Sequence, residues 1–367
     1  MRHFLDHAAT SPMRQVAVDA WVEHSGLLNP GGQYTSGRAA RRVLDDAREL
    51  IAALLDADPV EVIFTASGTE ANNLAVSGFA GGRVVASPLE HPSVLEPVKA
   101  SGAVEWLPVA GARVGDLSAL DQPASLATCM WANNETGALQ PVDEVVARAQ
   151  AVGTPVHIDA VQVVGHLPVS FRSSGATTLA ASAHKFGGPR SGGLLLARRS
   201  PAPAPVLHGG GQERGIRPGT IDVATAAATA AALEEAVGEM DAEATRLAGL
   251  RDRLRDGILA RVDDVVVHTP PEGVLPGHLH LSFPGAEGDS LIMLLDAAGI
   301  DASTGSACAS GVNRASHVLL AMGVEEQVVR GAVRFTLGRT STDADVDAVL
   351  AVIGDVVARA RLAGMAG

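Results

Sequence analysis

The stretch that decides the fold is SAHKFGG at residues 182–188, read together with VHIDAVQ at residues 156–162. In each stretch a run of apolar or small residues, typical of a buried strand, ends in a charged side chain: Asp159 in one and Lys185 in the other. Open α/β sheets bind ligands at the carboxyl ends of their strands, so we expect both side chains at one edge of a sheet. A buried lysine is costly to desolvate unless it has a chemical use. A lysine that forms a Schiff base and an aspartate that pairs with a ring nitrogen are what pyridoxal 5'-phosphate (PLP) requires. The alternative is a lysine that ends an edge strand and reaches solvent.

Composition restricts the class of protein. The 367 residues are 47% hydrophobic and carry a formal net charge of −13, which indicates a globular chain and argues against nucleic acid as a main ligand. No apolar run is long enough for a bilayer, and the first residues lack the apolar stretch of a signal peptide. The two cysteines, Cys129 and Cys308, form neither a disulfide framework nor a metal-ligand cluster. We therefore expect a cytoplasmic protein with no membrane partner and no metal.

The first half of the chain alternates short apolar runs with helical patterns. This alternation predicts βαβ units and an α/β fold with a mostly parallel sheet. A helix is expected over residues 141–152, because Pro141 suits a first turn and Gly153 a helix end. The predicted strands cover residues 61–65, 83–87, 126–131, 155–159, 179–183 and 192–197.

The second half predicts a smaller α+β domain. Residues 220–262 are rich in alanine and helical in pattern, and we expect Gly238 to divide them into two helices. The predicted domains are residues 13–240, the large one, and residues 1–12 with 241–367, the small one. Strands are expected over 265–268, 278–283 and 333–337, and helices around 291–298 and 343–362.

Four further motifs are candidates for ligand contacts. FTASGTEANN at residues 64–73 places small residues between a strand and a helix, which suits an anion; the alternative is an ordinary helix cap. His91 follows a strand, where an imidazole could stack on a ring and move protons, although a single histidine is more often structural. NNETG at residues 133–137 suits a turn or a ligand contact. The glycine-rich basic segment 209–220 ends in Thr220 and suits a second phosphate contact or a flexible surface loop.

Cys308 lies in STGSACASG, residues 303–311, where every neighbour is small. A cysteine in such a loop is a candidate nucleophile, because a reactive thiolate needs access. Cys129 lies in the apolar run LATCMW, residues 126–131, which is typical of a structural cysteine.

In this order, these motifs resemble the cysteine desulfurases, fold-type I PLP enzymes of the class V aminotransferase group. The resemblance begins with FLDHAATSP at residues 4–12 and ends with VRFTLGRT at residues 333–340. It implies a seven-stranded sheet and a PLP cofactor. The Cys308 segment resembles the long-loop branch, which supplies sulfur for iron–sulfur assembly and other transfers.

The resemblance also implies roles for individual residues. Lys185 would form the Schiff base, Asp159 would pair with the ring nitrogen and Cys308 would attack the substrate sulfur. By the same matching of motifs, His91 would stack on the ring and move protons, and Gln162 would contact the ring hydroxyl. The phosphate would be bound by Gly68, Thr69, Ser182 and His184, and in a homodimer Thr220 would reach the phosphate of the neighbouring subunit. Asn134 would contact both cofactor and substrate, and Arg334 and Asn29 would bind the substrate carboxylate.

The expected reaction converts L-cysteine to L-alanine and leaves a persulfide on Cys308 for an acceptor protein such as an iron–sulfur scaffold. Two departures stand out: Tyr34 replaces the histidine that many relatives carry, and residues 78–83 are shorter than usual. Tyr34 would alter the substrate entrance. The alternatives are a selenocysteine lyase, a class V aminotransferase that needs no Cys308, and a non-catalytic protein that has kept the fold.

Overall fold

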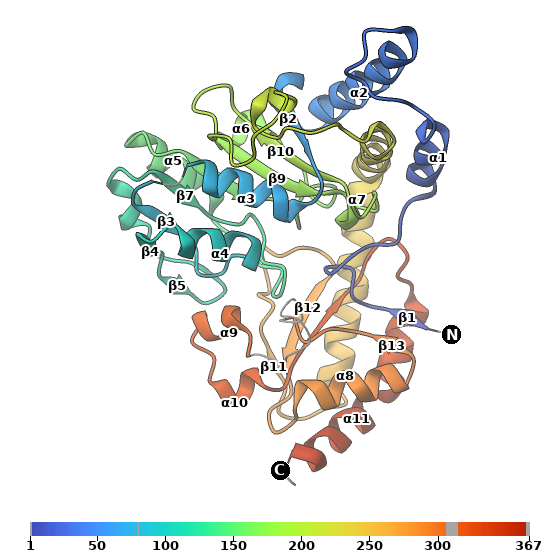
Figure 1. Ribbon diagram of the computed structural model, residues 1–367. Helices are drawn as coiled ribbons and strands as arrows, with labels where there is room; N and C mark the ends of the chain where they lie inside the picture. Colours follow the sequence, from blue (N-terminus) through green and yellow to red (C-terminus); the bar gives the residue numbers. More distant parts are fainter. Residues whose placement is uncertain (1, 80, 306–314, 365–367) are drawn as a thin grey trace.

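The computed structural model describes residues 2–79, 81–305 and 315–364, and its upper part in Figure 1 is built on a seven-stranded sheet. The strand order is β2-β10-β9-β8-β7-β3-β4. Only β10 runs antiparallel to its neighbours, so the predicted mostly parallel α/β sheet is confirmed. The strands are β2 (Val62–Thr65), β3 (Val84–Ala86), β4 (Val104–Trp106), β7 (Leu126–Thr128), β8 (Val156–Asp159), β9 (Thr178–Ser182) and β10 (Gly193–Ala197).

Helices cover both faces of this sheet, which explains why its strands read as continuous apolar runs. In β10, Leu194 and Leu196 pack into the cluster formed with α2 (Thr35–Leu54), α5 (Val142–Ala151) and the beginning of α7. Leu195 points to the opposite face, where it packs with α3 (Gly68–Gly78), and α4 (Pro92–Ala100) covers the neighbouring strands on that face. The sheet is therefore the middle of three layers.

The lower part of Figure 1 holds a second hydrophobic cluster around a three-stranded antiparallel sheet, in the order β11-β12-β14. The N-terminal strand β1 (His3–Phe4) pairs with β13 (Ile300–Asp301), and Leu5 belongs to this second cluster. The other elements here are β11 (Val266–Val267), β12 (His278–Ser282), α8 (Gly288–Ala297), β14 (Ala332–Thr336) and α11 (Asp343–Gly364).

One prediction for this region is wrong: Gly238 does not divide the Ala-rich segment. Residues Val223–Leu259 form one helix, α7, which runs from the upper to the lower part of the molecule (Figure 1). One exposed glycine costs a helix about 1 kcal/mol, and the surrounding alanines are strong helix formers. Packing at both ends outweighs that cost, since Leu233 lies in the first hydrophobic cluster and Leu254 in the second. The domain boundary predicted at residue 240 falls inside this helix, and the two-domain division remains a prediction.

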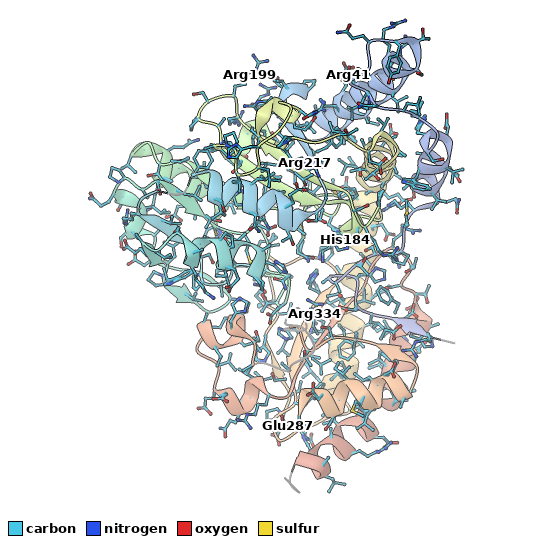
Figure 2. All side chains as sticks on the ribbon, in the orientation of Figure 1. Arg41, His184, Arg199, Arg217, Glu287 and Arg334 are labelled. Carbon is cyan, nitrogen blue, oxygen red and sulfur yellow. The ribbon has the colours of Figure 1, made fainter. Side chains whose placement is uncertain are left out.

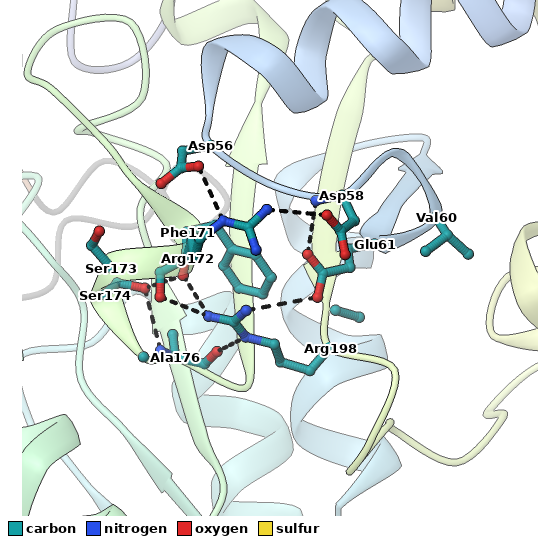
Figure 3. Close-up of polar contacts among 12 residues, drawn as sticks. Asp56, Asp58, Val60, Glu61, Phe171, Arg172, Ser173, Ser174, Ala176 and Arg198 are labelled. Carbon is teal, nitrogen blue, oxygen red and sulfur yellow. Dashed lines mark hydrogen bonds and ion pairs between the residues drawn. The ribbon is translucent and has the colours of Figure 1, made fainter.

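A polar cluster, drawn in Figure 3, ties the chain after α2 to the segment that follows β10. The Arg198 guanidinium lies 4.4 Å from the Phe171 ring centroid and pairs with Glu61 at 3.7 Å. Arg172 pairs with Asp58 at 3.0 Å. None of these residues lines the cavity described below, so the cluster is structural.

The remaining elements are short. They are α1 (Gln15–His24), β5 (Val109–Ala110), β6 (Arg113–Val114), α6 (Phe171–Ser174), α9 (His317–Ala321) and α10 (Glu326–Val329), together with four 3₁₀ turns over Pro59–Glu61, Ser118–Asp121, Ala183–Lys185 and Glu213–Gly215.

No helix in residues 2–79, 81–305 and 315–364 combines the length and the apolar character needed to cross a bilayer.

Candidate active site

A cavity of about 310 Å³ lies where the carboxyl ends of the large-sheet strands meet the three-stranded sheet. Figure 2 labels one residue from each side: His184, which follows β9, and Arg334 of β14. The predicted site residues that line the cavity are Gly68, Thr69, His91, Asn134, Asp159, Gln162, Ser182, His184, Lys185 and Arg334.

Asp159 is the last residue of β8 and is almost completely buried. Its Oδ1 accepts a hydrogen bond from the Val161 amide at 2.9 Å, and its Oδ2 accepts one from Asn72 Nδ2 at 2.7 Å. Burial raises the pKa of Asp159, whereas these two donors and the charge of Lys185 act in the opposite direction. A buried carboxylate held by donors on both oxygens is suited to a cationic partner in the cavity.

Lys185 ends the 3₁₀ turn Ala183–Lys185 that follows β9 directly. Its Nζ donates to the carbonyl oxygens of Ala8 at 2.5 Å and Ala9 at 2.8 Å. Gln162 Nε2 donates to the same Ala8 oxygen at 3.0 Å. The N-terminal segment therefore forms part of the site, because its backbone holds the amine and the amide side by side.

The helix α3 begins at the cavity and forms an anion cradle there. Ser67 caps the helix by accepting from the Glu70 amide at 3.1 Å, and the amide of Gly68 lies 3.4 Å from Ser182 Oγ. A Cβ at Gly68 would lie 2.8 Å from Val161 and 3.1 Å from Ser182, so any larger residue would force these side chains to shift. The backbone amides of the first helical turn and the positive end of the helix dipole favour a phosphate at this position.

His91 caps α4 and lines the cavity with its ring. Its Nδ1 lies 2.8 Å from Ser93 Oγ and 3.1 Å from the Ser93 amide nitrogen. Burial lowers the pKa of His91 to about 4, and the charge of Lys185 contributes in the same direction. His91 is therefore neutral at physiological pH. His184, whose pKa burial also lowers to about 4, has its Nδ1 3.1 Å from Thr10 Oγ1.

Arg334 supplies a guanidinium from the opposite wall and is only 4% exposed. It donates to Asp6 Oδ1 at 2.6 Å and to the Asn134 carbonyl at 2.8 Å. Its Nε is buried and has no hydrogen-bond partner among the residues that the structure describes. An arginine fork held in place but not saturated is suited to a carboxylate.

Two predicted residues lie away from the cavity. Asn29 and Thr220 are exposed and do not line the cavity, and Asn29 accepts from the Gly31 amide at 2.8 Å. Cys308 lies outside the described residues. Tyr34 is also exposed, at the start of α2, and does not line the cavity.

The sequence reasoning missed several lining residues, notably Asp6, Asn72, Ser93 and Met130. Asp6 lies within the N-terminal motif, but its partner Arg334 lies 328 residues away, so no local pattern predicts its role. Asn72 could have been identified from the sequence, because it places an amide one turn into the helix that follows the small-residue turn.

These residues fit PLP. The cradle at Gly68, where a Cβ would crowd Val161 and Ser182, lies in the same cavity as a buried carboxylate and a lysine. PLP presents a phosphate, a ring nitrogen that can carry a proton and an aldehyde, which match these three features in turn. Within the described parts of the chain, no group of three or more His, Cys, Asp or Glu side chains could hold a metal ion.

Comparison with known proteins gives the same answer. The profile of the family "Aminotransferase class-V" matches residues 3–349. The chain is 46% identical to the "IscS-like cysteine desulfurase" of Mycobacterium tuberculosis, covering 99% of this chain and 98% of that protein. It is 38% identical to the "Cysteine desulfurase IscS" of Dictyoglomus turgidum, covering 98% and 95%.

Solved structures agree on the fold. A "NIFS-LIKE PROTEIN" superposes with a TM-score of 0.90 at 32% identity, covering 98% of this chain and 100% of that one. A structure described as "SspA in complex with cysteine" has a TM-score of 0.78 at 26% identity, covering 91% and 98%. The chain therefore belongs to the PLP-dependent class V aminotransferase family and, within it, to the cysteine desulfurases.

Proposed function

We propose that this chain is an L-cysteine desulfurase that converts L-cysteine to L-alanine and keeps the sulfur as a persulfide on Cys308. The observation that carries the proposal is that Lys185, Asp159 and Arg334 line one cavity. A lysine and an aspartate suit the cofactor, and the guanidinium on the facing wall suits an amino-acid carboxylate.

Several residues would hold PLP. The amides at Gly68 and Thr69, with Ser182 and His184, would bind its phosphate, and Gln162 its ring hydroxyl. Asp159 would bind the ring nitrogen, and His91 would lie against the ring. When bound, PLP withdraws electrons from the substrate α-carbon and so makes its proton easier to remove.

Lys185 would carry the proton transfers. Its Nζ would hold the cofactor covalently and, when not bonded to it, would take the proton from the substrate α-carbon. The carbonyls of Ala8 and Ala9 orient this nitrogen. His91, neutral and with its Nδ1 occupied by Ser93, would act through its other ring nitrogen.

Arg334 would bind the substrate carboxylate. Its contacts to Asp6 and the Asn134 carbonyl fix the plane of the guanidinium before substrate arrives, which lowers the entropic cost of binding. Asn134 lines the same cavity and would contribute a second polar contact.

Cys308 would take the sulfur. Its thiolate would attack the substrate sulfur and form a sulfur–sulfur bond, while the carbon–sulfur bond breaks and its electron pair passes to the substrate carbon. Protonation of that carbon gives alanine, so cysteine and the enzyme thiol become alanine and an enzyme persulfide without an external oxidant.

The proposal includes a homodimer and a protein acceptor. Thr220 is exposed in the single chain. This exposure is what a contact to a neighbouring subunit requires. The side chains of Trp21 and Leu28 are 44% and 58% exposed, which suits burial against a second copy. An acceptor such as an iron–sulfur scaffold would collect the persulfide sulfur, and the cytoplasm is the proposed compartment because two cysteines suit reducing conditions.

The proposal is tested by product analysis of the purified protein with L-cysteine, with and without a thiol reductant. We expect alanine and sulfide in equal amounts with reductant. Without it, and with L-cysteine limited to one equivalent per subunit because cysteine is itself a thiol, we expect alanine to form while the sulfur stays on the protein. Pyruvate or another keto acid as product would support an aminotransferase instead. Borohydride reduction followed by peptide mapping should place the cofactor on Lys185, and a different lysine would contradict the assignment.

A further inference from the structure

Asn72 lines the cavity and connects three side chains there, although the proposed chemistry gives it no part. It is fully buried on α3, and its Nδ2 lies 2.7 Å from Asp159 Oδ2 and 2.8 Å from Ser93 Oγ. Its Oδ1 lies 3.0 Å from His157 Nε2. All three polar contacts of this amide are therefore made to side chains and not to backbone.

Only one orientation of the Asn72 amide satisfies these contacts. The carboxylate of Asp159 accepts hydrogen bonds and cannot donate when ionised, so the NH₂ group must face it. Reversing the amide would bring two oxygens together at 2.7 Å inside the protein. The oxygen of Asn72 consequently faces His157, which must donate.

His157 is arranged as that donor. It is fully buried in β8, and burial lowers its pKa to about 3, so the ring is neutral and carries one proton. Its Nδ1 lies 2.9 Å from Thr178 Oγ1, whose hydroxyl can donate. The proton therefore sits on Nε2 and points to Asn72.

The second contact of Asn72, to Ser93, determines which ring nitrogen of His91 carries the proton. Ser93 Oγ accepts one Nδ2 proton of Asn72, so its own hydroxyl proton is free to point to His91 Nδ1. The Ser93 amide also donates to that nitrogen. With Nδ1 occupied by two donors, the single proton of the neutral ring lies on Nε2.

We propose that Asn72 is a positioning residue: by donating to Asp159 and Ser93 at once, it keeps the Asp159 carboxylate ionised toward the cofactor ring and sets the tautomer of His91. This inference rests on the proposed pairing of Asp159 with the ring nitrogen of PLP. The alternative is that Asn72 only fills space between α3 and β8.

A positioning role and a space-filling role for Asn72 predict different relative affinities for a cofactor that lacks the ring nitrogen. In 1-deaza-PLP a carbon replaces that nitrogen, so the analogue cannot use an ionised Asp159. The ratio of its Kd to the Kd for PLP, measured on apoenzyme by equilibrium dialysis, isolates the contact that Asn72 is proposed to support. Because both values come from one variant, a partly unfolded population changes both equally and leaves the ratio intact.

Asn72→Leu keeps a similar volume and removes both donors. We expect the ratio to fall at least tenfold, in line with the loss of a hydrogen bond to a buried charged group. Asn73→Ala is the matched control, because the neighbouring amide bonds only the backbone carbonyls of Thr69 and Ser93, and its ratio should stay at the wild-type value. Ser93→Ala should also keep the ratio, since it cuts only the branch to His91.

If Asn72→Leu does not fold, Asn72→Asp serves the same purpose. It has the same shape, and a carboxyl 2.7 Å from Asp159 must share one proton with it, which weakens the charge facing the ring. A wild-type ratio well above one that persists in the Asn72 variant would overturn this inference alone. A wild-type ratio near one would overturn the role of Asp159, and this inference with it.

Discussion

The seven-stranded sheet supplies the cavity wall that carries Asp159 and Lys185, whereas the three-stranded sheet supplies the wall that carries Arg334. On the first wall, Asp159 is held by donors from neighbouring parts of one α/β layer: Val161, two residues on, and Asn72 of the helix packed on that layer. On the second wall, Arg334 is held by Asp6, from the other end of the chain, and by the Asn134 backbone.

This difference separates two tasks. The first wall belongs to a mostly parallel sheet that is packed on both faces, and its groups are proposed to hold the cofactor. The second wall is assembled from Asp6 of the N-terminal segment, β14 and the loop after β7, and it carries the arginine proposed to bind the substrate. We therefore expect changes on the first wall to affect cofactor binding and changes on the second wall to affect substrate turnover with the cofactor still bound.

Replacing Cys308 by serine should have the largest effect of this kind on turnover. Serine keeps the size of the side chain but lacks the thiolate that forms the persulfide, so alanine and sulfide production from L-cysteine should be lost while PLP remains bound. Mass spectrometry of the wild-type protein after cysteine treatment should find one added sulfur on the peptide that contains Cys308.

Cys129→Ser is the matched control for that experiment. Cys129 is fully buried after β7, and burial raises the pKa of its thiol well above the usual range, so it is not a nucleophile. This variant should retain turnover. Desulfuration by Cys308→Ser at the wild-type rate would refute the persulfide mechanism and leave a lyase or transaminase reaction.

Arg334→Ala should test the second wall directly. We expect KM for cysteine to rise while PLP stays bound, because the carboxylate loses a buried charged partner. Such a loss costs on the order of 2–5 kcal/mol, or roughly 30- to 4,000-fold. Steady-state kinetics and the absorbance of bound PLP measure the two effects separately. An unchanged KM would move the carboxylate site elsewhere, with Arg339 as the first alternative.

The two walls also differ in how far the sequence predicts them. Asp159 and Lys185 each end an apolar run, and the strand-end rule for α/β sheets places such side chains together without knowledge of distant contacts. Asp6 and Arg334 meet only because β1 packs beside β13 and the chain then bridges to β14. No local pattern encodes that pairing.

The continuous helix α7 is a second case in which a local sequence pattern does not reveal distant packing. A glycine inside an Ala-rich segment predicts a break from local propensity, but each half of the helix is anchored in a different hydrophobic cluster. His157 is the converse case: a polar residue inside an apolar strand signals a buried contact, although the pattern does not reveal that the contact is Asn72.

The folded protein should lose stability in mild acid, because histidines near both walls have lowered pKa values. Burial lowers the pKa of His91 and His184 near the first wall and of His268 near the second to about 4, below the ordinary value of 6.5. The unfolded chain then binds more protons than the folded one between pH 6.5 and 4, so stability falls as the pH drops through this window. The pKa values of Glu90, Glu135 and Asp159 are raised and act in the opposite direction, but histidines with lowered pKa outnumber them: His7, His91, His157, His166, His184, His268, His278 and His280.

Urea unfolding midpoints of the protein from pH 7.5 to 4.5 measure this loss. His268→Gln removes one titrating group and should flatten the slope below pH 6.5. His208→Gln, at an exposed position, is the control and should leave the slope unchanged. A midpoint that stays constant down to pH 5 would contradict the prediction.

The smallest effect concerns α7, which joins the two walls. Gly238 is exposed, and a Cβ there would meet nothing within 4 Å, so Gly238→Ala should stabilise the protein by about 0.4–1 kcal/mol and raise Tm by about 0.5–1.3 °C. Gly249 has the same surroundings in the second half of the helix, and Gly249→Ala should give a similar gain. If α7 is a rigid connection, both variants keep kcat/KM. A loss of kcat/KM in Gly238→Ala but not in Gly249→Ala would mean that the helix must bend between the clusters during turnover, and that the walls move relative to each other.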